Sequence, residues 1–194
     1  GEVSNKSEVY VVSAKEMKGL STLETPPGIL GVFPRKDPSL PSGDILIIID
    51  GIQDPGNLGT IIRTADAAGA SGVAVLKGSI DPYNHKVVRG SMGSIFHIPV
   101  VKVEDVKSFF NMMVDRYLVI GTSSHRGTLY YEFQWKLPLA LIFGSEARGL
   151  SRDVEEFCKD TIRIPIFGKA ESLNVAVACG VILYEVARKI MVKY

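Results

Sequence analysis

The chain has 194 residues, of which 22 are Lys or Arg, 21 are Asp or Glu and 46% are hydrophobic. This length predicts one domain of ordinary size with room for a fragment of a second. The net charge of +1 excludes a uniformly basic nucleic-acid binder, so a role of that kind needs a local basic patch. Cys158 and Cys179 belong to no Cys pair or metal motif. Without a secretory pattern, they predict free thiols in a cytoplasmic protein.

The beginning of the chain is poor in core-forming residues. It predicts a short strand at 9–12, a helix around 15–20 and a strand at 28–33, too little to bury a core alone. A proline-rich stretch at 34–44 then predicts a linker. We therefore expect three parts: 1–36, the end of a domain whose earlier part is missing; 37–44, the linker; and 45–194, the main domain.

Strands and helices are expected to alternate after the linker. Apolar runs predict the strands: 45–49, 73–76, 98–101, 118–121, 139–143 and 161–164. Helical spacing and capping residues predict the helices: one that Asn57 caps and Gly69 ends, 83–89, 106–113, a short one from Ser151, and 172–191. This alternation predicts an α/β fold with a mainly parallel sheet flanked by helices. The apolar run 175–184 is about half a membrane span, which indicates a buried helix instead.

Several common site motifs are absent from the sequence. No GxGxxG follows a predicted strand, and the segment around Lys169 lacks the spacing of a phosphate-binding loop. The three histidines lack metal-ligand spacing, so we expect no metal site. An α/β hydrolase with Ser145 as nucleophile stays an alternative, although no spacing supports its triad.

Three segments at predicted strand ends carry the candidate chemistry: 50–63, 141–151 and 164–185. Arg63 lies roughly 140° around its helix from the apolar residue Leu58, so it is either a solvated arginine or a functional one. The second segment, which contains Glu146 and Arg148, is either a surface turn with an ion pair or part of a site. In the third segment Ser172 is suited to cap the final helix, and Asn174 is unusual inside a helix unless it serves a partner.

Together these three segments resemble the SpoU (TrmH-like) branch of the SPOUT methyltransferases. The motifs that match are Asn57, Gly59 and Arg63; then Gly144, Glu146 and Gly149-Leu150-Ser151; then Ile164-Pro165 and Ser172-Leu173-Asn174-Val175. The resemblance covers about residues 44–192, with the motifs in the family's order. One departure is Ala147-Arg148, where many relatives carry a second glycine, which changes the bulk and charge of this loop.

The resemblance implies a C-terminal trefoil knot, a homodimer and methyl transfer from S-adenosylmethionine to ribose 2′-hydroxyls of structured RNA, with rRNA favoured over tRNA. It makes residues 9–33 the end of an N-terminal RNA-binding domain. It assigns catalytic roles to Arg63, Asn57, Glu146, Ser172 and Asn174, and cofactor contacts to Gly144, Ile164 and Leu173. Thr122, which follows another strand, is a fourth candidate for the cofactor.

In this interpretation Arg63 steers the ribose hydroxyl and stabilises the developing oxyanion, because a guanidinium is too basic to accept the proton. Glu146 orients Arg63 or Asn57. Basic residues near the predicted loops form a candidate RNA surface: Lys86, Arg89, Arg126, Arg148, Arg152 and Lys169, with His125 beside them. The final helix suits either a dimer interface or the core. A non-catalytic RNA-binding protein that keeps the fold stays the main alternative.

Overall fold

The structure is a computed structural model that describes residues 8–34, 38–40 and 42–191. The chain divides into two compact units, Gly1–Lys36 and Asp37–Tyr194. Within 8–34 the regular element is helix α1 (Ala14–Leu20), whose start is fixed by a capping box between Ser13 and Glu16. The predicted helix is thus confirmed.

The strands predicted at 9–12 and 28–33 are wrong, since neither segment forms a strand in the structure. Most of their apolar side chains are exposed, with Val11 97% accessible, and α1 has no buried residue. A strand needs a hydrogen-bonded neighbour and a covered face, and the described part of this unit supplies neither.

The second unit is built on a sheet of seven strands, and every pair of neighbours is parallel. The strands are β1 (Ile45–Asp50), β2 (Gly72–Leu76), β3 (Val100–Val103), β4 (Leu118–Ser123), β5 (Thr128–Leu129), β6 (Leu139–Gly144) and β7 (Asp160–Arg163). Their order across the sheet is β3-β2-β1-β6-β4-β7-β5. The parallel α/β prediction is therefore confirmed, and β6 lies between β1 and β4.

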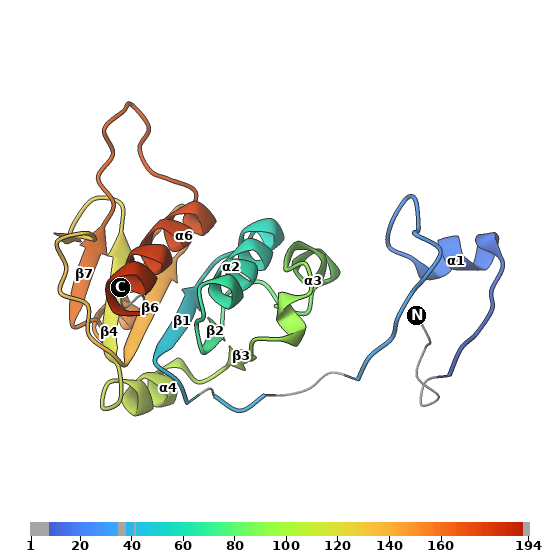
Figure 1. The fold of residues 1–194 in the computed structure, drawn as a ribbon, viewed down its shortest axis with the longest axis horizontal. Helices are drawn as coiled ribbons and strands as arrows, with labels where there is room; N and C mark the ends of the chain where they lie inside the picture. Colours follow the sequence, from blue (N-terminus) through green and yellow to red (C-terminus); the bar gives the residue numbers. More distant parts are fainter. Residues whose placement is uncertain (1–7, 35–37, 41, 192–194) are drawn as a thin grey trace. The chain divides into compact units, whose positions relative to one another are not determined.

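Helices cover both faces of this sheet (Figure 1). They are α2 (Pro55–Ala67), α3 (His85–Gly90), α4 (Val106–Met113), α5 (Arg152–Glu155) and α6 (Val175–Val186), with a 3-10 turn η1 (Ser94–Phe96) and a π-helical turn η2 (Ala187–Met191). Ile47 and Ile49 of β1 face the core under α2 and α6, and Leu46 and Ile48 face the core under α4. All six residues of β1 and of β6 are buried, which explains why both strands are almost entirely apolar.

Three helix starts differ from the prediction. α3 begins at His85 instead of 83, with Asn84 as its cap. Asp54 caps α2, where its carboxylate accepts from the N–H of Asn57 at 2.7 Å, so Asn57 is inside the first turn. Asn174 caps α6, accepting from the N–H groups of Ala176 and Val177 at 2.9 and 3.3 Å, so Ser172 lies before the helix. Carboxylate and amide oxygens cap as well as hydroxyls do, and the choice depends on where the chain turns.

The third strand also begins later than predicted. The N–H of Ile98 bonds to the carbonyl of Ser94 and closes the η1 turn, so the strand begins at Val100 instead of 98. Among the described residues, no helix is long and apolar enough to cross a membrane.

Candidate active site

The three motif segments meet at one edge of the sheet. β1 and β6 are parallel neighbours whose last residues, Asp50 and Gly144, are paired in register. The chain leaves β1 toward α2, and it leaves β6 into the loop that carries Glu146. The carboxyl ends of adjacent parallel strands form the usual ligand crevice of such a sheet.

A chain of side-chain hydrogen bonds joins the three motifs. The Asn57 amide nitrogen donates to Oε1 of Glu146, and the Asn174 amide nitrogen donates to Oδ1 of Asn57 at 2.8 Å. Oδ1 of Asn174 is occupied by the α6 cap, so the orientation of its amide is determined on both sides. The structure therefore brings Asn57, Glu146 and Asn174 together. The sequence left two possible partners for Glu146, Arg63 and Asn57, and Glu146 is bonded to Asn57.

The β6–α5 loop is closed by a short bridge. The backbone groups of Ser145 and Gly149 exchange two hydrogen bonds, of 3.0 and 2.9 Å. A Cβ on Gly144 would lie 2.3 Å from the carbonyl carbon and oxygen of Gly149, and Gly149 itself has φ of +69°. Glycine is needed at both positions because the loop folds directly back on the end of the strand.

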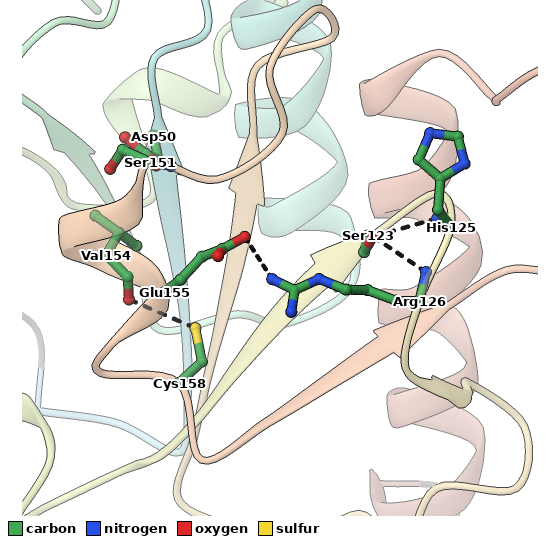
Figure 2. A network of polar contacts seen from close by, with 8 residues as sticks. All are labelled: Asp50, Ser123, His125, Arg126, Ser151, Val154, Glu155 and Cys158. Carbon is green, nitrogen blue, oxygen red and sulfur yellow. Dashed lines mark hydrogen bonds and ion pairs between the residues drawn. The ribbon is translucent and has the colours of Figure 1, made fainter.

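Asp50 is a site-edge residue that the sequence reasoning missed. Its side chain is only 7% exposed, and Oδ2 accepts from the N–H of Ser151 at 2.6 Å (Figure 2). This bond ties the end of the β6–α5 loop to the neighbouring strand β1. The sequence held one indication of this role, a carboxylate as the last residue of an otherwise apolar strand. A carboxylate in that position is buried only when it has a hydrogen-bond partner.

A pocket of about 410 Å³ opens beside this loop. Its walls come from the ends of β4 and β6, the two loops that follow them, the segment after β7 and the first turns of α6. The predicted cofactor contacts all line it: Thr122, Gly144, Ile164 and Leu173. Ser172 and Glu146 line it as well, so one side of the hydrogen-bonded motif cluster faces the pocket.

Arg63 stands apart from this cluster. Its side chain is exposed on α2, it does not line the pocket, and it makes no hydrogen bond or ion pair within the described part of the chain. The structure confirms that it lies off the apolar face of its helix. It does not bring Arg63 into contact with Glu146, the other partner that was considered.

The six basic residues of the candidate RNA surface are all exposed. Lys86 and Arg89 lie on α3, whereas the other four lie on loops and α5 around the pocket. Arg126 is not a free cation, because its guanidinium forms an ion pair of 2.6 Å with Glu155 (Figure 2). Arg126 and Arg148 also line the pocket.

Both cysteines are free thiols. The Sγ of Cys158 lies 3.6 Å from the carbonyl of Val154 (Figure 2), and burial together with the nearby Glu155 carboxylate raises the pKa of this thiol to about 11. Complete burial also raises the pKa of Cys179. Neither thiol is activated, which fits a structural role. The described residues contain no group of three or more His, Cys, Asp or Glu placed to bind a metal ion.

Comparison with known proteins identifies this arrangement. The model of the SpoU rRNA methylase family matches residues 44–184. The chain belongs to this family. SpoU proteins are RNA methyltransferases, and the matched range contains Asn57, Glu146 and Asn174, which meet at one edge of the sheet.

Two relatives illustrate the similarity in sequence. The 23S rRNA (guanosine(2553)-2′-O)-methyltransferase RlmP of Bacillus subtilis is 37% identical over 177 residues, which is 91% of this chain and 71% of RlmP. A putative TrmH family tRNA/rRNA methyltransferase of Staphylococcus haemolyticus is 39% identical over 181 residues, 93% of this chain and 64% of the relative.

Solved structures agree with this assignment. An AdoMet-bound rRNA methyltransferase from Sinorhizobium meliloti superposes with a TM-score of 0.83 at 32% identity, covering 92% of this chain and 70% of that one. The SpoU methyltransferase AviRb from Streptomyces viridochromogenes, in complex with AdoMet, gives 0.71 at 36% identity, covering 75% and 60%. The SpoU chain described here thus spans from 60% to 71% of the length of these four proteins.

Proposed function

We propose that this chain transfers a methyl group from S-adenosylmethionine to a ribose 2′-hydroxyl of structured RNA, with rRNA as the preferred class. The observation that carries the proposal is the hydrogen-bonded series Asn174, Asn57, Glu146 at the edge of the pocket. Ordered polar side chains beside a cavity of this size are typical of a small-molecule site. The similarity to RlmP, named as a 23S rRNA 2′-O-methyltransferase, supports the choice of rRNA.

The pocket fits the proposed methyl donor. Ile164, Leu173 and Ile182 give it apolar walls for an adenine ring. The backbone N–H and C=O groups of Ile164 and Leu173 have no hydrogen-bond partner among the described residues, so they are available to a purine edge. Thr122 is a weaker donor candidate, because its hydroxyl already donates to the carbonyl of Ile142 at 2.8 Å. Its oxygen can still accept.

The chemistry requires positioning of the ribose more than activation of the methyl group. S-adenosylmethionine supplies the electrophilic methyl group itself. Arg63 is exposed and has no partner among the described residues, so its guanidinium can bind the 2′-oxygen and an adjacent phosphate. It stays protonated and stabilises the oxygen as its proton leaves. Asn57 and Glu146 keep the loop fixed, and Ser172 and Asn174 complete the side of the site facing RNA.

RNA binding is assigned to the exposed basic residues around this edge: Lys86, Arg89, Arg126, Arg148, Arg152 and Lys169. Cations on loops around a site contact phosphates and set the orientation of the RNA without reading its sequence. Arg126 takes part only if RNA displaces the Glu155 carboxylate from it.

We further propose a C-terminal trefoil knot and a homodimer that acts in the cytoplasm. Exposed apolar side chains on α6, Val177 and Tyr184, support a partner for this otherwise buried helix. Residues 1–36 belong, in this proposal, to an RNA-binding domain joined through the linker 37–44.

The test is transfer to a 23S rRNA transcript that spans the counterpart of guanosine 2553, the position named for RlmP. Mass spectrometry of the digested RNA should show a 2′-O-methylated nucleoside. Arg63→Ala should slow transfer by about 100-fold, the usual cost of one lost oxyanion contact, and leave S-adenosylhomocysteine binding unchanged. Equal rates for Arg63→Ala and wild type would overturn the role of Arg63. Binding of S-adenosylhomocysteine without transfer to rRNA or tRNA would favour a non-catalytic RNA-binding relative.

A further inference from the structure

Met92 occupies an unusual position between α3 and η1. It has φ of +50° and is the non-glycine residue with a positive φ among those described. Its side chain is 71% exposed. A left-handed backbone is unfavourable for a residue with a Cβ, and an exposed Met gains nothing from burial to offset this. The next residue, Gly93, also has a positive φ, so the chain reverses sharply here.

The segment that carries Met92 contacts, on both sides of Met92, the face of α2 to which Arg63 belongs. On one side, a Cβ on Gly59 would lie 2.9 Å from backbone atoms of Gly90, so α2 and α3 are in backbone contact there. On the other side, Nδ1 of His97 lies 3.3 Å from Oδ2 of Asp66. Arg63 is four residues after Gly59 and three before Asp66, so all three share one face of α2. Figure 1 shows α3 alongside α2.

The turn is held rigidly in this conformation. Ser91 is completely buried, and its hydroxyl donates to the carbonyl of Val88 at 2.7 Å. Ser94 is buried on the other side of the turn, and the N–H of Met92 bonds to the carbonyl of Arg89 at 3.2 Å. The surroundings therefore fix the Met92 side chain in an outward direction.

The charged residues of the segment that carries Met92 are all basic, and the Asp66 carboxylate of α2 lies against His97 at its end. The segment 82–98 contains Lys86, Arg89 and two histidines and no Asp or Glu. Lys86 and Arg89 are both exposed. A projecting apolar side chain among cations is complementary to an unstacked nucleotide, whose base needs an apolar surface and whose flanking phosphates need positive charge.

We propose that Met92 supports the base of an unstacked RNA nucleotide at or next to the methylated ribose, while Arg89 and Lys86 contact the flanking phosphates. The inference rests on the proposed function and adds a substrate-binding residue to it. Met92 selects for an unpaired target because a base within a duplex cannot lie against it.

The experiment compares Met92→Ala and Met92→Gly with Met112→Ala. Met112 is 56% exposed on α4, which covers the opposite face of the sheet, so it is a matched control. Fluorescence anisotropy measures binding of the 23S rRNA transcript, and calorimetry measures binding of S-adenosylhomocysteine. We expect both Met92 variants to bind RNA about tenfold more weakly, as for one buried Met side chain, with unchanged S-adenosylhomocysteine affinity. Met112→Ala should bind RNA as wild type does.

The glycine variant separates a structural from a functional role. Glycine tolerates a positive φ, so Met92→Gly should melt no lower than wild type while its RNA affinity falls. Wild-type RNA affinity in both Met92 variants overturns the inference. A shift in oligomeric state by sedimentation, with RNA affinity unchanged, would instead place Met92 against a second copy of the chain. If wild type binds S-adenosylhomocysteine but no RNA, the proposed substrate fails together with the inference.

Discussion

The amide of Asn174 donates a hydrogen bond of 2.8 Å to Oδ1 of Asn57, although 117 positions separate the two residues. Through Asn57 this bond reaches Glu146, so the start of α6, the start of α2 and the β6–α5 loop are positioned relative to one another. The same Asn174 side chain also caps α6. Stability of a helix and geometry of the site thus depend on one residue.

These two roles can be separated by substitution. Asn174→Ala should lose the cap and lower the free energy of unfolding by about 1 kcal/mol. Asn174→Ser should keep the cap and the stability, because a hydroxyl accepts from the same N–H groups, but it cannot reach Asn57. We expect both variants to slow methyl transfer. Urea denaturation and a transfer assay measure the two effects, and full activity in Asn174→Ser would show that the bond to Asn57 is dispensable.

Gly144 is expected to be intolerant of any side chain. Its added Cβ would lie 2.3 Å from the backbone of Gly149, which cannot yield as a flexible side chain could. Gly144→Ala should therefore cost about 1–3 kcal/mol of unfolding free energy and distort the pocket. Gly168→Ala is the matched control, because a Cβ there meets nothing within 4 Å. Equal denaturation midpoints for the two variants would contradict the close approach of loop and strand.

Cys158 should be unreactive in the folded protein. Burial and the Glu155 carboxylate raise the pKa of its thiol from 9.0 to about 11, so the nucleophilic thiolate is scarce at pH 8. Folding should also become less favourable as pH rises from about 9 toward 11, because the unfolded chain loses this proton first. Alkylation by iodoacetamide, followed by mass spectrometry, should modify Cys158 far more slowly in native than in urea-unfolded protein. Equal rates would show that the thiol is more exposed than in this structure.

Much of the fold could be predicted because buried parallel strands leave a strong pattern. β1 and β6 are continuous apolar runs, and helical spacing identified the helices between them. Cap residues were harder to assign. Asp54, Asn57, Ser172 and Asn174 are all good caps by type, and the tertiary contacts decide among them. The segments 9–12 and 28–33 were predicted as strands because periodicity cannot show whether a partner strand exists.

The site was predictable in its residues but not in its connections. Motif resemblance found Asn57, Glu146 and Asn174, whereas their mutual bonds span long sequence separations that no local pattern encodes. Asp50 was missed because it differs from a surface carboxylate only in burial, which depends on the loop that returns over it.

The most direct test of the central claim is calorimetric titration with S-adenosylhomocysteine. Wild type, Ile164→Asp and Leu173→Asp are compared with Phe167→Asp, a control whose side chain is 93% exposed and which does not line the pocket. The account predicts micromolar binding by wild type and Phe167→Asp, and its loss in the two pocket variants, where a carboxylate replaces apolar wall. Absence of binding by folded wild type, or undiminished binding by both pocket variants, would contradict the assignment of this pocket to the methyl donor.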